Sequence, residues 1–437
     1  MPDTRLFTEP GNARVRPIRG RPARHRNKVR HEHPLFKSVA VALVFLLAFG
    51  ASFLGLSYNR MQGNITQQDI GELLGDNRPT SSGTPAPTDL NAGQALNLLV
   101  IGSDSREGAN DVDGAGASGT TSGMRSDTTM LVHISADRTH IEVVSIPRDT
   151  LVDIPACTLP DGTTTEPQYD AMFNSAFQLG AAGGDIGSAT ACTMLTVEQL
   201  TGIYIDDFVA VDFAGFINVI DALGGVAMYV PEDIDDAAAG LTISQGCRLL
   251  DGQQALGFAR VRKSVGDGSD ISRISRQQDL VLAVMEEALS SNLLRSPTRL
   301  YQFLDSGTQT LTTGNRIGDI RALVGLGTSL ASISTANITF ITMPFEWAGP
   351  RVVPASDYAG LVWDAIRADT PVDPIYSGDA PDISAALRAR EAAGAVPSGE
   401  PSATPGTAVT EAPGTSPTVA PVEPTDDPQQ CTKENAS

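Results

Sequence analysis

The run "SVAVALVFLLAFGASFLGLSY", residues 38–58, contains 21 consecutive residues without a charge. A helix needs about 20 apolar residues to cross the hydrocarbon core of a bilayer, so this run predicts one transmembrane helix. A cleaved signal peptide is the alternative, because "FGAS" offers small residues, but the apolar part of a signal peptide is typically only about 7–15 residues long. The run therefore divides the chain into two parts that face different environments.

Charge predicts the orientation of this helix. Residues 1–37 hold eight Arg and two Lys against three acidic residues, a balance of +7, whereas the whole chain carries −20, so the remaining residues carry −27. By the positive-inside rule we expect residues 1–37 in the cytoplasm and everything after residue 58 outside a cell membrane that is crossed once. The strongly acidic larger part also argues against a nucleic-acid partner.

The cysteines and histidines exclude some kinds of site. All four cysteines follow the apolar run, where disulfides are permissible: Cys157, Cys192, Cys247 and Cys431. They allow three full pairings, and spacing does not choose among them. No Cys/His spacing typical of zinc occurs, and only His133 and His140 follow the run. The part of the chain after the run therefore has few of the residues that a zinc site or a Ser–His–Asp triad needs.

Composition predicts one globular domain beyond the membrane. We expect residues 59–95 to form a stalk or linker, residues 96–375 to form the domain, and residues 376–437 to form a disordered tail rich in Pro, Ala and Thr. The apolar run 96–102 predicts a buried strand, and residues 127–134 and 140–146 predict a hairpin. Helical patterns follow around residues 173–180, 192–201, 213–223, 272–291 and 316–333, with a strand at 338–343 and a last helix near 357–367. The interleaving predicts an α/β fold with a central mixed β-sheet covered by helices on both faces.

Charged residues follow the ends of these predicted strands. Asp104 and Arg106 come directly after the buried strand, where open α/β sheets usually bind ligands, although an Asp in a turn explains them as well. In the hairpin, a two-residue loop at Asp137 and Arg138 pairs residues whose numbers sum to 275. That register places Asp127 opposite Arg148, and Arg125 near Thr150. A structural salt bridge explains this pairing equally well.

A third charged group lies in "RVRKSVGDGSDISRISRQQ", residues 260–278. The preceding "GFARVR" is typical of a strand, and period-2 alternation would place Arg260 and Arg262 on one face. The spacing i, i+3, i+7 places three further residues on one face of the following helix: Asp270, Arg273 and Gln277. Lys263, Asp267 and Arg276 are expected to be ordinary surface residues.

This combination of residues indicates a kind of chemistry. Arginine guanidinium groups match phosphate oxygens bidentately, and carboxylates without soft ligands suit Mg²⁺ held together with substrate phosphates. Phosphoryl transfer needs mostly positioning and neutralisation of charge, which such a set supplies without a protein nucleophile. We therefore expect a diphosphate ligand with Mg²⁺ as cofactor, Mn²⁺ being a possible substitute.

The order of these motifs resembles a known family. "IGSDSR", "RSDTTMLVHI", "SIPRDT", "MFNSAF", "DALGGV", "LDGQQALGFARVR" and "DISRISRQQ" occur in the order and approximate spacing of the LytR-CpsA-Psr family of cell-wall glycopolymer ligases. The resemblance covers about residues 96–375. It implies a membrane-anchored phosphotransferase that moves a glycopolymer from a polyprenyl-pyrophosphate carrier to peptidoglycan and forms a phosphodiester link.

The resemblance also implies residue roles. Asp104 and Asp127 would hold Mg²⁺, and Asp270 would orient the arginines. The residues that would bind the pyrophosphate are Arg106, Arg125, Arg148, Arg260, Arg262, Arg273 and Gln277. Catalysis would rest on Asp127, Arg148, Arg260 and Arg262. A hydrophobic channel between sheet and helices would take the prenyl chain.

The segment from Cys157 to Cys192 is similar to the actinobacterial branch of the family, which implies a Cys157–Cys192 disulfide and arabinogalactan, or a teichoic-acid-like chain, as the polymer. The loop 107–124 inside the motif region departs from the family pattern, as does the tail. Two other functions stay open: a polyprenyl-pyrophosphate hydrolase that uses water as acceptor, and a non-catalytic polyprenyl-phosphate-binding regulator of the cell envelope.

Overall fold

The computed structural model describes residues 34–76, 78–79, 93–103, 126–261, 270–290, 293, 296–330, 333–394, 431–433 and 435–436. Two compact units are present, residues 1–56 and residues 57–437, and each is described by itself.

Helix α1 (Pro34–Asn64) contains the predicted apolar run. Within it, residues 43–64 have the length and the apolar composition of a membrane span. The large apolar side chains between Leu43 and Leu56 that the structure describes as exposed each have more than half of their surface accessible, as in Phe49 with 73%. Such a helix has its apolar groups available to lipid.

The segment after the apolar run belongs to the second unit. Strand β1 (Thr66–Gln67) pairs in parallel with β12 (Leu311–Thr313), and the short helix α2 (Gly71–Leu74) follows. Met61, Ile65, Ile70 and Leu74 are each at most 8% exposed. The prediction of a stalk from residue 59 is therefore wrong for this segment, because its few apolar side chains are enough to pack it against the domain. Residues 80–92 lie outside the described residues.

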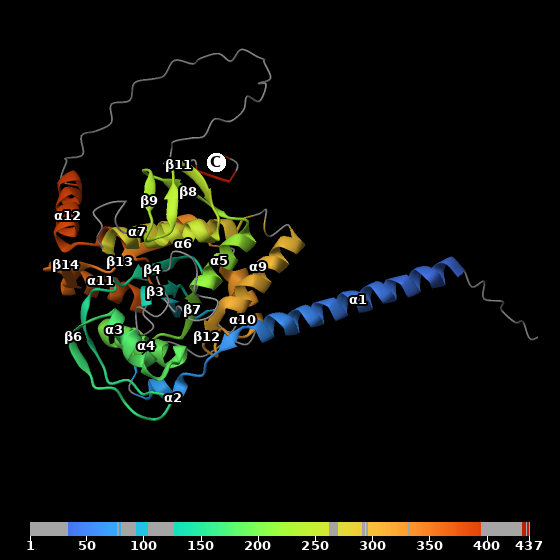
Figure 1. The fold of residues 1–437 in the computed structure, drawn as a ribbon, viewed down its shortest axis with the longest axis horizontal. Helices are drawn as coiled ribbons and strands as arrows, with labels where there is room; N and C mark the ends of the chain where they lie inside the picture. The colour runs from blue at the N-terminus through green and yellow to red at the C-terminus, as the bar shows by residue number, and fades with distance from the viewer. Residues whose placement is uncertain are drawn as a thin grey trace, which may run out of the picture. The chain divides into compact units, whose positions relative to one another are not determined.

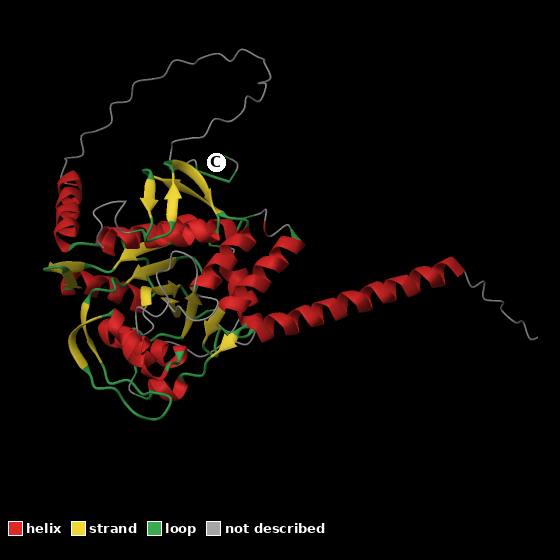
Figure 2. Cartoon of the chain, viewed as in Figure 1, coloured by secondary structure: helices red, strands yellow, loops and turns green. Residues whose placement is uncertain are grey.

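A seven-stranded sheet lies at the centre of the domain (Figures 1 and 2), in the order β1-β12-β7-β2-β3-β4-β13. Its main strands are β2 (Leu96–Ser103), β3 (Ser126–Ile134), β4 (Ile141–Ser145), β7 (Asp207–Asp212) and β13 (Ile338–Thr342). Strand β2 is parallel to β7 and antiparallel to β3, and β4 is antiparallel to β3 and parallel to β13. The predicted mixed sheet is confirmed.

The β3–β4 hairpin has the predicted register. Met130 pairs with Ser145 and Ile134 with Ile141, so the numbers of paired residues sum to 275. The connection is longer than the expected two residues, because the Ser135 N–H donates to the His140 carbonyl and leaves residues 136–139 as the loop. This four-residue loop keeps the register.

Each face of the sheet is covered by helices. Leu99, Leu131 and Val144 are fully buried on one face, against α3 (Asn174–Gly180), α4 (Ile186–Thr201) and α11 (Ser356–Arg367). The alternate residues Leu98, Met130 and Val143 face α7 (Asp270–Ala288) and α10 (Ile320–Leu330). Figure 1 shows α3 and α4 on one side of the strands and α7 on the other. Side chains alternate along a strand, so both faces are apolar, as a sheet with two helical layers requires.

A second apolar cluster lies beyond α7. It is formed by side chains of α7 and of α5 (Phe213–Leu223), α6 (Gly252–Arg260), α9 (Pro297–Thr310), β8 (Val226–Val230), β9 (Ile234–Asp236), β10 (Leu241–Ile243) and β11 (Gly246–Leu250). Val284 of α7 packs in this cluster, whereas Val281 and Met285 pack on the sheet. Helix α7 therefore lies between two cores.

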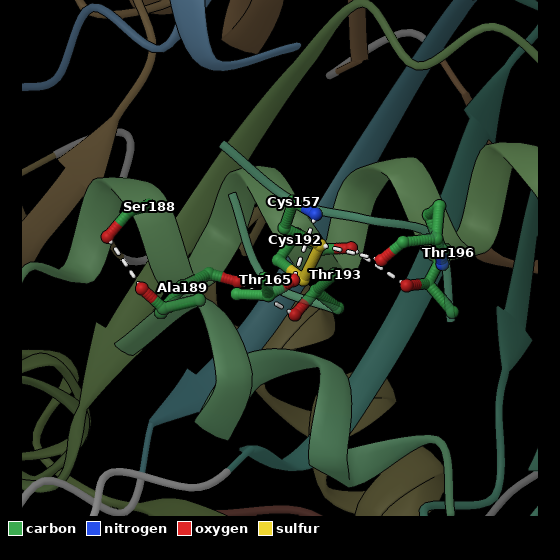
Figure 3. The surroundings of a disulfide bond; sticks show 9 residues. Cys157, Thr165, Ser188, Ala189, Cys192, Thr193 and Thr196 are labelled. Atoms are coloured by element: carbon green, nitrogen blue, oxygen red, sulfur yellow. Dashed lines mark hydrogen bonds between the residues drawn. A yellow bond between two sulfur atoms is a disulfide. The ribbon is translucent and has the colours of Figure 1, made fainter. Parts of the chain in front are cut away.

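Two disulfides link distant segments. Cys157, in the loop between β5 (Leu151–Ile154) and β6 (Gln168–Met172), bonds to Cys192 of α4 (Figure 3). This is the pairing that the resemblance implied. Cys247 of β11 bonds to Cys431, so the C-terminal segment is attached to the second cluster. Lys433 also contacts Glu287 over 2.9 Å.

The remaining elements follow the sheet. They are β14 (Phe345–Ala348), β15 (Arg351–Pro354), α12 (Ala380–Gly394) and the 3₁₀ turns Ala181–Gly183, Thr335–Asn337 and Pro374–Tyr376. The tail prediction from residue 376 is wrong for α12, in which Ile383 is 1% exposed. Its Ala, Leu, Arg and Glu residues favour a helix, and Ile383 anchors that helix. Residues 395–430 lie outside the described residues.

Candidate functional site

Several strands end at one edge of the sheet. The parallel strands β2 and β7 end at Ser103 and Asp212, β4 ends at Ser145, and the antiparallel strand β3 begins at this edge with Ser126. Loops that follow the carboxyl ends of parallel strands are where α/β proteins usually bind ligands. The predicted site residues follow these strand ends.

Asp127 and Arg148 meet at this edge, as the hairpin register predicts. Arg148 Nη1 donates to Asp127 Oδ1 over 2.5 Å, and the Arg148 and Asp127 side chains are 19% and 31% exposed respectively. The Arg148 carbonyl accepts the Asn174 N–H at 3.0 Å, which holds the backbone of this residue against the start of α3. Asp149, which sequence reasoning did not single out, lies 3.7 Å from Arg148 Nε. The pair is partly open to solvent and can contact a ligand.

Arg260 is on a helix and not on the predicted strand. Asp251 begins α6 with a capping box: its carboxylate accepts the Gln254 N–H at 2.8 Å, and the Gln254 side chain accepts the Asp251 N–H at 3.1 Å. The expected strand over "GFARVR" is therefore wrong, and the D-x-x-Q spacing was the signal for a helix start. Arg260 is the last residue of this helix, so period-2 alternation no longer relates it to Arg262.

The Arg260 guanidinium lies over the ring of Phe213, 5.1 Å from its centroid. Phe213 begins α5 directly after β7 ends. This cation–π contact therefore places Arg260 at the same edge of the sheet as the carboxyl end of β7. Sequence reasoning missed Phe213, because nothing along the chain relates it to a residue 47 positions later.

Helix α7 includes Asp270, Arg273 and Gln277, as predicted, and two of these polar side chains are buried. Arg273 is 3% exposed and Gln277 9%. The Gln277 side chain donates to the Ala259 carbonyl at 3.3 Å, next to Arg260. Gln278 donates to Ser145 Oγ at 2.9 Å, at the end of β4. These bonds fix the start of α7 between α6 and the sheet edge and place Gln277 beside Arg260, with Arg273 about one helical turn earlier.

The prediction that Arg276 is an ordinary surface residue is wrong. Its side chain is 7% exposed, and Nη2 donates to the Val261 carbonyl at 2.5 Å. Val261 directly follows α6, so Arg276 satisfies a buried carbonyl at the end of this helix. The buried position follows from α7 packing on both sides, which a helix with a solvated face would not do.

Some predicted residues cannot be placed. Asp104, Arg106, Arg125 and Arg262 lie outside the described residues, as do Lys263 and Asp267, and of Asp270 only the backbone is described. Their roles stay predictions. The described part of the site therefore consists of Asp127, Arg148, Arg260, Arg273 and Gln277.

Apolar side chains on one face of the sheet stay half-buried although helices cover them. Val100 of β2 and Val209 of β7 have this character, as do Val281 and Met285 of α7 opposite them. On the other face, the corresponding residues Leu99, Ile101 and Phe208 are completely buried. Packing between the sheet and α7 is thus less complete than packing on the α3–α4 side, and apolar surface remains accessible beside the charged edge.

Comparison with known proteins gives consistent matches. The chain is 28% identical to the cell wall biosynthesis protein LcpA of Corynebacterium glutamicum, over 76% of this chain and 64% of LcpA. It is 32% identical to the probable cell wall biosynthesis protein LcpB of the same organism, over 53% of this chain and 51% of LcpB. The chain thus spans between half and two thirds of these two relatives. A third relative is the polyisoprenyl-teichoic acid–peptidoglycan teichoic acid transferase TagU of Oceanobacillus iheyensis, 29% identical over 82% of this chain and 96% of TagU.

Among solved structures, a LytR-Csp2A-Psr enzyme from Actinomyces oris is 22% identical, covers 71% of this chain and 97% of its own, and superposes with a TM-score of 0.47. The model of the LytR_cpsA_psr family matches residues 57–366, which include every described residue of the site. The match begins within α1 and ends within α11, so it takes in the whole central sheet. The chain belongs to the LytR_cpsA_psr family.

Proposed function

We propose that this protein transfers a glycopolymer from a polyprenyl-pyrophosphate carrier to peptidoglycan and forms a phosphodiester link. TagU of O. iheyensis carries the name of such a transferase, and LcpA and LcpB are named for cell wall biosynthesis. The polymer would be arabinogalactan or a teichoic-acid-like chain. One observation supports the proposal: a hairpin, a helix end and a helix start that each carry an arginine meet at one sheet edge, beside accessible apolar surface.

Arginine groups suit a diphosphate for physical reasons. A guanidinium group makes two parallel hydrogen bonds to phosphate oxygens and keeps its charge at any working pH. Arg148 is held by Asp127, Arg260 by the Phe213 ring, and Arg273 by its buried position on α7. Groups held in place before the substrate binds cost no reorganisation during reaction, and they stabilise charge that develops on the leaving phosphate.

The residues present fit a hard divalent cation such as Mg²⁺. Asp127 offers a partly exposed carboxylate, and among the described residues this edge has no cysteine or histidine. Oxygen ligands at a phosphate site are what Mg²⁺ prefers. Asp127 would hold the ion together with Asp104. When bound, the ion would neutralise phosphate charge. Mn²⁺ has the same ligand preference.

The half-buried apolar side chains provide a surface on which the prenyl chain would bind. Val100, Val132 and Val209 of the sheet and Val281 and Met285 of α7 form an apolar surface next to the charged edge. A polyprenyl diphosphate has the same division, with a charged head and an apolar tail. Burial of apolar surface contributes about 25 cal/mol per Å², so a long prenyl chain would add substantially to affinity.

The reaction balances without an external oxidant or reductant. An acceptor hydroxyl of peptidoglycan attacks the phosphorus that carries the polymer, an O–P bond forms, and the bond from this phosphorus to the polyprenyl-phosphate oxygen breaks. The hydroxyl proton leaves to solvent or to a base. Arg148, Arg260 and Arg273 hold the diphosphate in line and stabilise the leaving polyprenyl phosphate.

The location follows from helix α1 and the cysteines. Helix α1 would anchor the chain, with residues 1–37 in the cytoplasm and the domain outside. Two disulfides support an oxidising compartment for the domain, because such bonds are rare in the cytosol.

Product analysis tests the proposal. The full chain in detergent, supplied with Mg²⁺, lipid-linked glycopolymer and peptidoglycan strands, should yield polymer joined to peptidoglycan through phosphodiester bonds. Release of unlinked polymer at a rate independent of the acceptor would favour the hydrolase instead. Binding of polyprenyl phosphate without either product would favour the regulator. Both outcomes contradict the transferase.

A further inference from the structure

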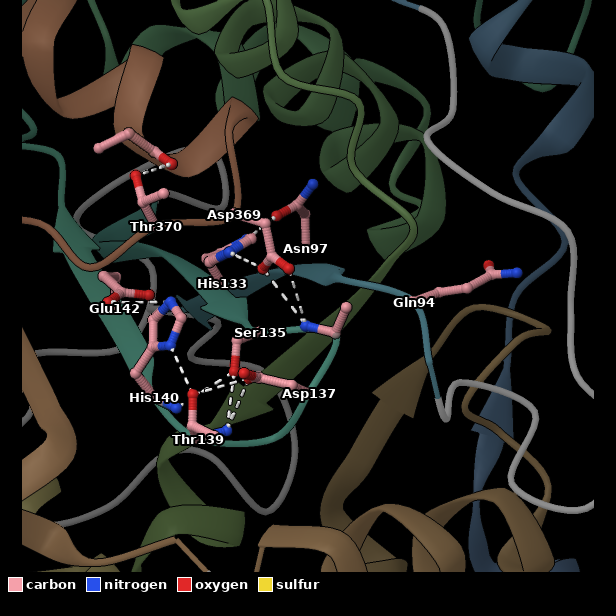
Figure 4. Close-up of polar contacts among 12 residues, drawn as sticks. Gln94, Asn97, His133, Ser135, Asp137, Thr139, His140, Glu142, Asp369 and Thr370 are labelled. Carbon is pink, nitrogen blue, oxygen red and sulfur yellow. Dashed lines mark hydrogen bonds and ion pairs between the residues drawn. The ribbon is translucent and has the colours of Figure 1, made fainter.

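A second polar cluster lies at the opposite end of the β3–β4 hairpin (Figure 4). His133 of β3 pairs directly with Glu142 of β4, and His140 precedes Glu142 by two residues. One ligand atom from each of these three side chains lies within 4.8 Å of the other two. Asp369, which follows α11, lies beside them, with Oδ1 3.1 Å from His133 Nε2. Three buried side chains with metal-binding atoms thus converge, and Asp369 lies against one of them.

Glu142 is the most unusual member of the cluster. Its side chain is 0% exposed, and among the described residues neither carboxylate oxygen has a hydrogen-bond partner. The backbone N–H of Val372 faces the carboxylate but lies outside hydrogen-bonding geometry. The nearest cationic candidate is His140 Nε2, 3.8 Å from Oε1, and this nitrogen also has no hydrogen-bond partner in the described part of the chain. A buried carboxylate without a partner is costly, so a missing group is indicated.

The hydrogen bonds fix which nitrogen of His133 carries the proton. The Asn97 side-chain amide donates from Nδ2 to the Tyr204 carbonyl at 2.9 Å, so its Oδ1 faces the ring. His133 Nδ1 lies 2.7 Å from this oxygen and must therefore donate to it. In the neutral ring the lone pair is then on Nε2, the atom that faces Asp369.

The same reasoning applies to His140. The Thr139 hydroxyl donates to Asp137 at 2.7 Å, which leaves its oxygen to accept from His140 Nδ1 at 3.0 Å. The lone pair of His140 is therefore on Nε2 as well, and it points toward Glu142. Metal-binding histidines usually show this arrangement, in which the other ring nitrogen donates to a neighbouring oxygen and so orients the ligand.

These assignments leave two acceptors face to face. His133 Nε2 and Asp369 Oδ1 are 3.1 Å apart, and in the neutral ring neither carries a proton. The Ala136 N–H, at 3.2 and 3.3 Å, already satisfies part of the Asp369 carboxylate. A cation is needed in this space, and it is either a proton on His133 or a metal ion that both atoms bind.

We propose that His133, His140, Glu142 and Asp369 bind one divalent transition-metal ion of the Zn²⁺ class. Two imidazoles and two carboxylates give four ligands whose two negative charges balance the ion. Ligands about 2.0–2.2 Å from a tetrahedral Zn²⁺ lie roughly 3.3 Å from one another. The separations of two pairs, 3.1 Å for His133–Asp369 and 3.8 Å for His140–Glu142, are close to this value. Asp369 is not one of the three side chains whose ligand atoms lie within 4.8 Å of one another, so it would move toward His140 and Glu142 when the ion binds. Asp369 is 33% exposed, so the ion has a route from solvent.

The role of this ion is structural. His133 lies six positions after Asp127 on β3, about 20 Å along a strand, so the ion cannot take part in reaction at the diphosphate site. A site with four protein ligands has no open position for substrate, as in other structural zinc sites. The ion would attach the β3–β4 hairpin to the segment after α11, which brings together an early and a late part of the domain.

Metal titration of the full chain in detergent tests this proposal. After treatment with chelator, Co²⁺ should bind in one equivalent with the visible absorption of a tetrahedral site, and Zn²⁺ should displace it and raise the melting temperature. The chain also has His25, His31 and His33 in its basic N-terminal segment. A variant with these three changed to Gln is the matched control and should keep the absorption and the stoichiometry.

His140→Gln should abolish the tetrahedral spectrum and weaken binding at least about 10-fold. His140 is 12% exposed at the edge of the cluster, so we expect its variant to keep the fold. Glu142→Gln should likewise lose the tetrahedral spectrum, provided that this variant folds. The proposal is overturned by an absence of saturable Co²⁺ binding, which would leave a proton on His133 as the cation. It is also overturned if His140→Gln leaves Co²⁺ binding unchanged, or if Co²⁺ binding is lost when the three N-terminal histidines are changed to Gln.

Discussion

Arg148 Nη1 and Asp127 Oδ1 lie 2.5 Å apart at the open end of the β3–β4 hairpin, 21 residues apart in the chain. The pair is partly exposed, with 19% and 31% of the two side chains accessible. A purely structural pair at the surface would contribute only about 0–1 kcal/mol to stability. An arginine that is held in place beside a ligand contributes instead to binding and reaction.

Arg148→Ala should therefore lower transferase activity by about 100-fold or more, with little change in the melting temperature. Arg148→Lys should keep little of the activity, because an ammonium group cannot make the bidentate contact. The control is Arg321→Ala, which breaks the pair with Asp319, where the arginine is 78% exposed. Full activity in Arg148→Ala, or an equal loss in both alanine variants, would contradict the assigned role.

Arg260 and Arg276 should respond in opposite ways. Arg260→Ala should cripple turnover while the domain still folds, because the guanidinium lies at the end of α6 over the face of the Phe213 ring and not in an apolar core. Arg276→Ala should lower the free energy of unfolding by about 1–3 kcal/mol, because it leaves the Val261 carbonyl buried without its donor. Parallel activity assays and urea unfolding separate the two effects. If Arg260→Ala unfolds the domain, its role is structural.

The Cys157–Cys192 bond should stabilise the domain measurably. Both residues are at most 1% exposed, and the bond closes a segment with a sequence separation of 35. Replacing both by Ser should lower the free energy of unfolding by about 2–5 kcal/mol. Peptide mapping without reductant should recover Cys157 with Cys192 and Cys247 with Cys431. Recovery of any other pairing would contradict the structure, and an unchanged unfolding curve in the double variant would contradict the stabilising role.

Glu142 should make stability pH-dependent once metal is removed. Burial raises the pKa of this carboxyl from its ordinary 4.5 to about 8, and the Asp369 charge adds to the effect. His133, His140 and Asp369 are the titratable groups that face it. The folded state keeps the proton that the unfolded chain loses, so the contribution to stability is full below pH 4.5 and is lost as the pH rises to about 8.

The measurement compares wild type with Glu142→Gln in chelator by urea unfolding between pH 4 and pH 9. The wild type should lose stability relative to the variant by up to about 1.4 kcal/mol per pH unit in this window. The other titrating groups are common to both proteins and largely cancel. A difference that stays constant with pH would mean that Glu142 is not buried as the structure shows it.

The limits of sequence reasoning are visible in particular residues. The hairpin register could be predicted because a loop centred on Asp137 and Arg138 fixes which residues pair, and it placed Asp127 opposite Arg148. The strand over "GFARVR" was wrong because local β-propensity was preferred to the capping box at Asp251. Arg276 was taken for a surface residue because helical periodicity does not tell how many sides of α7 are covered.

Sequence alone determined the apolar helix, the α/β class, the strand pairing within the hairpin and the kinds of charge at the strand ends, because these depend on local periodicity and composition. Tertiary structure decided which distant residues meet: Phe213 with Arg260, Cys247 with Cys431, and Asp369 with His133. Such contacts depend on how helices pack on the sheet, and packing is set by the sum of many weak apolar contacts across the whole chain.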